Sequence, residues 1–163
     1  MRSIWVTFRK EGVHKYPGAD TDPRYATGDW DDVSFLGFPH RHKFYFKVWI
    51  EVFQNDRDIE FIQFQRWLDR RYSSVEKGLD GDVLQLDYKS CEMIADDLAG
   101  VIQAKYPGRW LKISVAEDNE NGCEIEYPKE EMIPEDIEGS YYKSDPRMDK
   151  EDGMTSYHNG IDD

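Results

Sequence analysis

Residues 40–52, HRHKFYFKVWIEV, carry the clearest pattern in the chain. Every second position is a histidine or an apolar residue, and most of the positions between them are charged or polar. A period of two predicts a β-strand that buries one of its faces. His40 and His42 stand at the start of the apolar row, so we expect both imidazoles to point inward.

The other patterned segments predict an α+β domain around this strand. Residues 3–9 and 110–117 alternate in the same way, and residues 123–127 can pair with the latter across a turn. Residues 61–72 and 91–105 repeat apolar side chains at helical spacing, and Ser90 is a suitable N-cap for the second helix. The order along the chain is two strands, then two helices, then two strands. This order predicts an antiparallel four-stranded sheet with both helices packed on one face.

Length and charge define the domain organisation and exclude some partners. The chain has 163 residues, enough for one domain, and a formal net charge of −13. Residues 128–163 hold eleven acidic and four basic side chains, a net charge of −7, which leaves −6 for residues 1–127. We expect a folded domain over 1–127 and an acidic, partly disordered, solubilising extension over 128–163, or alternatively a decoy for a basic surface. Neither nucleic acid nor an anionic membrane is an expected partner.

The cysteines and the absence of apolar stretches indicate the compartment. Cys91 and Cys123 are the two cysteines, with no CxxC motif, and the N-terminal residues do not resemble a signal peptide. No stretch approaches the roughly 18 apolar residues that a transmembrane helix requires. We therefore expect a cytoplasmic protein without a membrane span.

Three of the histidines are candidate metal ligands. Two inward imidazoles without partners would cost about 1–3 kcal/mol each, whereas one shared ion would satisfy both. His14 follows the first predicted strand and becomes a third ligand if the first two strands form a hairpin. Three histidines with an open fourth position are typical of a catalytic zinc site. The alternative is that His40 and His42 are hydrogen-bonded residues near a strand end.

Glu117 is the second unusual residue, because it continues the apolar row of residues 111, 113 and 115. A buried carboxylate needs hydrogen-bond donors. A ligand with two parallel N–H groups, such as the edge of a pterin or guanine ring, would supply them bidentately. The alternative is that the strand ends here and the side chain of Glu117 reaches solvent.

At these segments the sequence resembles the 6-pyruvoyl-tetrahydropterin synthase and 6-carboxytetrahydropterin synthase family, from Phe8 to Tyr127. HRHKFYFKVWIEV is similar to the family's HGH strand, and DIEFIQFQRWL to the segment that leads into its first helix. KSCEMIADDLAGVI resembles its PTSEN-led helix, and VAEDNENGCEIEY its closing hairpin. The resemblance implies a T-fold whose strands assemble into an oligomeric barrel, in a homo-oligomer that is a trimer or a hexamer.

The same resemblance implies a function and a set of site residues. His14, His40 and His42 would bind zinc, and Glu117 would anchor the ring of a dihydroneopterin triphosphate-like pterin substrate. Ser90 and Cys91, which match the start of the PTSEN-led helix, would contact the substrate from the neighbouring subunit. The implied activity is that of a zinc-dependent pterin lyase or synthase.

The chain also departs from the family at the residues that transfer protons. Leu36 occupies the position of the usual catalytic cysteine, and GLDGDVLQLDYK, between the helices, has no histidine for the family's Asp-His pair. An enzyme would have to use another acid or base, for which the candidates are Asp118, Asp80, Asp82 and Tyr88. The alternative is a catalytically inactive protein that binds or sequesters a pterin, a guanine-type nucleotide or a nucleotide signal.

Overall fold

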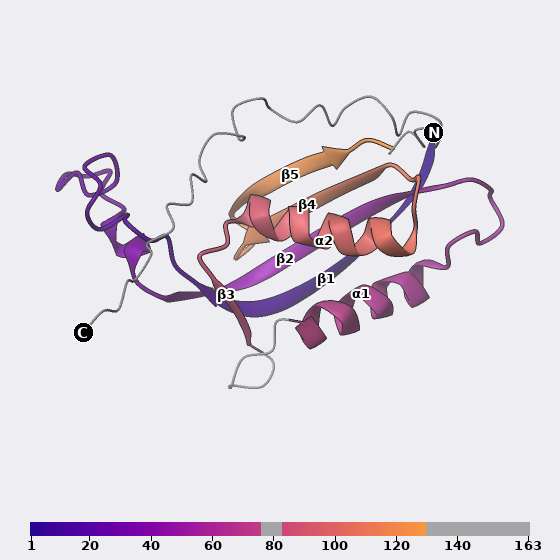
Figure 1. The fold of residues 1–163 in the computed structure, drawn as a ribbon, viewed down its shortest axis with the longest axis horizontal. Coiled ribbons are helices and arrows are strands. Elements are labelled where there is room, and N and C mark those ends of the chain that lie inside the picture. Colours follow the sequence, from indigo (N-terminus) through magenta and orange to yellow (C-terminus); the bar gives the residue numbers. More distant parts are fainter. Residues whose placement is uncertain (76–82, 130–163) are drawn as a thin grey trace, which may run out of the picture. The chain divides into compact units, whose positions relative to one another are not determined.

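The computed structural model describes residues 1–75 and 83–129 (Figure 1). Its elements are β1 (Arg2–His14), a 3₁₀ turn (Ser34–Gly37), β2 (His40–Val52), α1 (Phe61–Val75), β3 (Leu84–Asp87), α2 (Cys91–Lys105), β4 (Leu111–Glu117) and β5 (Asn121–Tyr127). The strand predicted over 40–52 and the helix predicted over 91–105 are confirmed at both ends. Apart from Pro128 and Lys129, the predicted acidic extension lies outside the described residues. Neither described helix is long and apolar enough to cross a membrane.

The strands form one open sheet in the order β3-β1-β2-β4-β5 (Figure 1). Neighbouring strands are antiparallel except β3, which runs parallel to β1. The predicted α+β class is confirmed, but the prediction of a four-stranded antiparallel sheet is wrong, because the sheet has five strands and is mixed. Two apolar residues in β3, Leu84 and Leu86, are too few to mark a strand in the sequence.

Both helices cover the same face of the sheet, as predicted (Figure 1). Helix α1 packs against β1, and helix α2 packs against β4 and β5. The apolar rows of the three central strands and the inner faces of both helices form one core, which includes Phe8, Phe44, Phe46, Phe64, Leu68, Ile94, Leu98 and Ile113. Because one face is buried, a slip of one residue in any strand would expose its apolar row, so the burial fixes the register.

The register brings the predicted site residues to one end of the sheet. His14 pairs with His40, Gly12 pairs with His42, and Phe44 pairs with Glu117. Strand β1 is longer than the predicted 3–9, so His14 is its last residue and does not follow it. Cross-strand partners lie on the same face, and the histidines therefore continue the buried row.

Gly12 leaves room for the aromatic ring that underlies the histidines. A Cβ atom at this position would lie 2.8 Å from Leu86 Cδ1 and 2.9 Å from Phe44 Cε2. Real Cβ atoms do not approach other carbons so closely, and both neighbours are fully buried. A side chain at residue 12 would therefore displace Phe44 or Leu86.

We expect Gly12→Ala to lower the free energy of unfolding by about 1–3 kcal/mol, the usual cost of overpacking a core. Gly100→Ala is the matched control, because a Cβ atom at this position in α2 meets nothing within 4 Å. The control should be neutral or stabilising by up to about 1 kcal/mol, since alanine is the better helix former. Urea denaturation measures both, and a Gly12→Ala protein as stable as wild type would contradict the packing described here.

Candidate metal centre

His14, His40 and His42 form a cluster at the end of the sheet. Their ring centroids lie 4.6 Å (14 to 40), 5.4 Å (14 to 42) and 5.0 Å (40 to 42) apart. One nitrogen from each ring lies within 4.8 Å of the other two, and no other group of this kind is found in residues 1–75 and 83–129. The antiparallel pairing of β1 and β2 therefore brings His14 beside His40 and His42, which the prediction of a third ligand required.

Backbone carbonyls fix the orientation of two of the rings. Nδ1 of His14 lies 2.8 Å from the carbonyl oxygen of Lys89, and Nδ1 of His40 lies 2.7 Å from that of Phe38. A carbonyl oxygen can only accept, so Nδ1 must carry the hydrogen in both rings. In the neutral imidazole the lone pair is then on Nε2.

Asp118 orients the third ring. Nδ1 of His42 donates to Asp118 Oδ2 over 2.6 Å, and the backbone N–H of Lys43 donates to Oδ1 over 2.9 Å. Asp118 adopts a positive φ of 52° in the turn after β4, a conformation that aspartate tolerates better than most residues. The hydrogen bond from His42 lowers the pKa of Asp118, so the carboxylate remains charged.

Within residues 1–75 and 83–129, the buried Nε2 atoms of His14 and His42 have no hydrogen-bond partner. Buried polar atoms almost always have partners, and an acceptor without a donor is costly. A cation would satisfy them, and three imidazole nitrogens with their Nδ1–H groups held by oxygen atoms are a donor set that suits zinc. The side chain of His42 is 22% exposed and that of His14 is 8% exposed, so the cluster is not sealed from solvent.

Glu117 faces the histidines, and its side chain is 27% exposed. Its Oε1 lies 3.2 Å from His14 Nε2, and its Oε2 lies 3.7 Å from His42 Nε2. The neighbouring His14 lowers the pKa of Glu117 despite the opposing effect of burial. Burial by itself would lower the pKa of His14, but Glu117 and the Lys89 carbonyl outweigh it and raise this pKa.

Cys91 lies beside Glu117 at the first turn of α2. Its Sγ donates a hydrogen bond to Glu117 Oε1 over 3.7 Å. Burial, together with the negative charge of Glu117, raises the pKa of Cys91 to about 12. The thiol is therefore protonated at neutral pH and is not a ready nucleophile.

The remaining candidates have other positions. Ser90 is the N-cap of α2, where its hydroxyl accepts from the Met93 N–H over 3.3 Å. Tyr88 is exposed in the turn after β3, and Leu36 lies in the 3₁₀ turn. Asp80 and Asp82 lie outside the described residues. Nothing in the sequence indicated that the carbonyls of Phe38 and Lys89 would contact histidines. The β2–β4 register pairs Phe44 with Glu117 and therefore places the next residue, Asp118, opposite Lys43.

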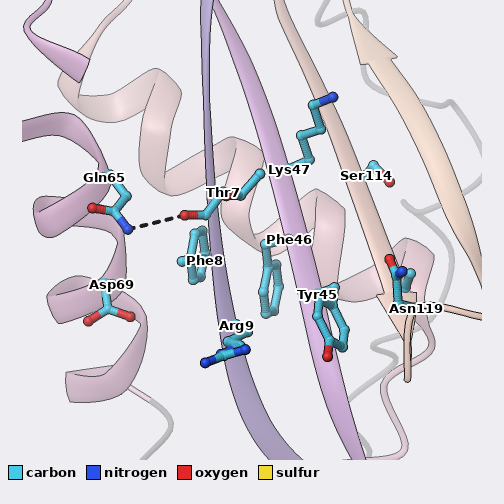
Figure 2. A pocket seen from close by; sticks show the side chains of 11 residues that line it. Thr7, Phe8, Arg9, Tyr45, Phe46, Lys47, Gln65, Asp69, Ser114 and Asn119 are labelled. Carbon is cyan, nitrogen blue, oxygen red and sulfur yellow. Dashed lines mark hydrogen bonds between the residues drawn. The ribbon is translucent and has the colours of Figure 1, made fainter. Parts of the chain in front are cut away.

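A separate pocket of about 610 Å³ is lined from β1, β2, β4 and α1 (Figure 2). Thr7, Arg9, Tyr45 and Lys47 line it from strand positions that alternate with the histidine row, and Gln65 of α1 donates to the Thr7 carbonyl. None of the three histidines borders this pocket. We place the candidate chemistry at the histidines, because no described residue donates a hydrogen bond to the buried Nε2 atoms of His14 and His42.

Comparisons with known proteins support the fold alone. No protein-family model and no curated protein matches the chain. Among solved structures, the uncharacterized protein WS1659 from Wolinella succinogenes is similar with a TM-score of 0.51 and 11% sequence identity. The match covers 76% of this chain and 97% of that one.

We expect Asp118→Asn to weaken zinc binding by about 10- to 100-fold, because the charge that orients and polarises His42 is lost. Asparagine suits the positive φ at this position, so the turn should be retained. Competition with a chromophoric chelator measures the affinity. Glu124→Gln, an exposed residue of β5 paired with Lys112, is the control and should bind zinc like wild type. Equal affinities for all three proteins would contradict a role of Asp118 at the metal.

Proposed function

We propose that the chain holds one zinc ion through His14, His40 and His42. One observation carries this proposal: in the described part of the chain, the buried Nε2 atoms of His14 and His42 have no hydrogen-bond partner, while Nδ1 of each ring is held by an oxygen atom. Nδ1 of His40 is held in the same way. An imidazole that donates through Nδ1 and is free at Nε2 is the usual state of a histidine ligand.

We further propose that the zinc protein is a T-fold enzyme of the pterin synthase type, acting on a dihydroneopterin triphosphate-like substrate. The open sheet with two helices on one face, and the resemblance between residues 8 and 127, support this assignment. A bound zinc ion would supply a Lewis acid that polarises hydroxyl or carbonyl oxygens of the substrate.

The chain's own residues would orient the substrate and move protons. Glu117 would hold the ring by its carboxylate, and Asp118 would keep His42 in its binding orientation. Because Asp118 is already occupied by His42 and Lys43, Tyr88 is the remaining described candidate for a proton donor. Tyr88 directly follows β3 in the chain and precedes Lys89, whose carbonyl oxygen accepts from His14 Nδ1.

A second function, ligand binding without catalysis, is favoured by the state of the cysteines. Burial raises the pKa of Cys91 to about 12 and also raises that of Cys123, so neither is a ready thiolate. A protein of this kind would bind or sequester a pterin, a guanine-type nucleotide or a nucleotide signal.

Incubation of the zinc-loaded protein with dihydroneopterin triphosphate separates the two functions. We expect an enzyme to form a new pterin product, detected by chromatography with fluorescence, and His42→Ala to abolish it by removing a ligand. Binding measured by calorimetry without product would support the second function. If the protein neither binds nor converts the compound, the pterin assignment is wrong.

We also propose that the chain forms a trimer or a hexamer whose sheets join into a barrel. The face of the sheet that no described helix covers supports this assembly, since Trp5 is 56% exposed there and Lys47 Nζ lies 4.5 Å and 4.6 Å from the ring centroids of Trp5 and Trp49. Native mass spectrometry should report three or six subunits. A monomer at micromolar concentration would contradict the proposal.

A further inference from the structure

We propose that Glu117 is a fourth ligand of the metal as long as no substrate is bound. The carboxylate would close the site, and an incoming substrate oxygen would have to displace it before Glu117 could hold the ring. This inference rests on the proposed zinc site and goes beyond it, because it gives Glu117 a role at the metal and makes substrate entry a competition.

The position of Glu117 supports a direct contact with the metal. Glu117 ends β4 and pairs with Phe44 of β2, two residues along that strand from His42 and on the same face. Its two oxygens contact two different histidines, at 3.2 Å from His14 Nε2 and 3.7 Å from His42 Nε2. Such distances place the carboxylate beside the Nε2 atoms of two of the three histidines, His14 and His42.

The charges at this contact require a positive group between the carboxylate and the rings. The Nε2 atoms of His14 and His42 present lone pairs in the neutral rings, because each Nδ1 donates to an oxygen atom. Lone pairs facing a carboxylate repel it. Within residues 1–75 and 83–129, Glu117 makes no ion pair with a lysine or an arginine. A divalent cation would convert the repulsion into four favourable contacts, three from histidine and one from glutamate.

Cys91 holds the carboxylate in this orientation. Its thiol, only 8% exposed, donates to Oε1 over 3.7 Å. No hydrogen bond to Oε2 is found in the described part of the chain, which leaves this oxygen free to bind a metal. The partner at Oε1 is a weak donor, so it would restrain the carboxylate without preventing its displacement.

A proton is the alternative positive group. A histidinium at His14 paired with Glu117 would give the same distances without any metal. The two explanations differ in what the carboxylate contributes once a metal is present, and a spectroscopically visible ion can distinguish them.

The experiment uses Co²⁺ in place of zinc and compares wild type with Glu117→Ala and Glu117→Gln. We expect each variant to bind Co²⁺ at least about tenfold more weakly. Loss of a direct ligand should cost at least as much affinity as loss of a residue that hydrogen-bonds to a ligand. The visible absorption of the Co²⁺ protein should change in both variants. Azide should alter the spectrum of the Ala variant at concentrations that leave wild type unchanged, because only that variant offers an empty position.

Glu120→Ala is the matched control, because Glu120 is an exposed carboxylate in the turn that directly follows Glu117. It should match wild type in affinity, spectrum and azide response. Thermal unfolding of each metal-free variant checks that it is folded, and the isosteric Gln variant retains the test if the Ala variant does not fold.

Two results would overturn the inference, and only the second would also overturn the proposed zinc site. If wild type binds Co²⁺ and both Glu117 variants match it in affinity, spectrum and azide response, Glu117 is not a ligand, and the three-histidine site stands. If wild type does not bind Co²⁺ at all, the proposed zinc site fails together with the inference.

Discussion

The pairing of β1 with β2 is the constraint on which the site depends. It sets His14 opposite His40 and Gly12 opposite His42, and the apolar rows of both strands continue into the core. A shift of one residue would turn the imidazoles to the other face of the sheet and expose the phenylalanines. Burial of the core therefore also fixes the geometry of the three histidines, and no separate interaction is needed to bring them together.

The surroundings of the rings then determine what the cluster can bind. Two loop carbonyls and one carboxylate engage the Nδ1 atoms, and this leaves Nε2 as the free nitrogen of each ring. The β4–β5 hairpin supplies both nearby carboxylates from adjacent residues, with Glu117 facing Nε2 atoms and Asp118 bonded to Nδ1 of His42. Two negative groups beside three imidazoles favour a divalent cation over an anion.

The sequence was sufficient to predict the elements whose patterns are long. The strand over 40–52 and the helix over 91–105 have continuous apolar rows, and the inward direction of His40 and His42 followed from their phase. Strand β3 was missed, because four residues carry too little pattern. The contacts of His14 and His40 could not be predicted, because they come from backbone carbonyls, which every residue possesses. Glu117 was predicted in the buried row, but its approach to the histidines depends on the β2–β4 register.

X-ray absorption spectroscopy of the zinc-loaded wild-type protein tests the central claim, that three imidazoles hold one metal ion. The account predicts one zinc per chain, with three imidazole nitrogens at about 2.0–2.1 Å in the first coordination sphere. A protein that retains no zinc after exchange, or a zinc ion with fewer than three imidazole ligands, would contradict it.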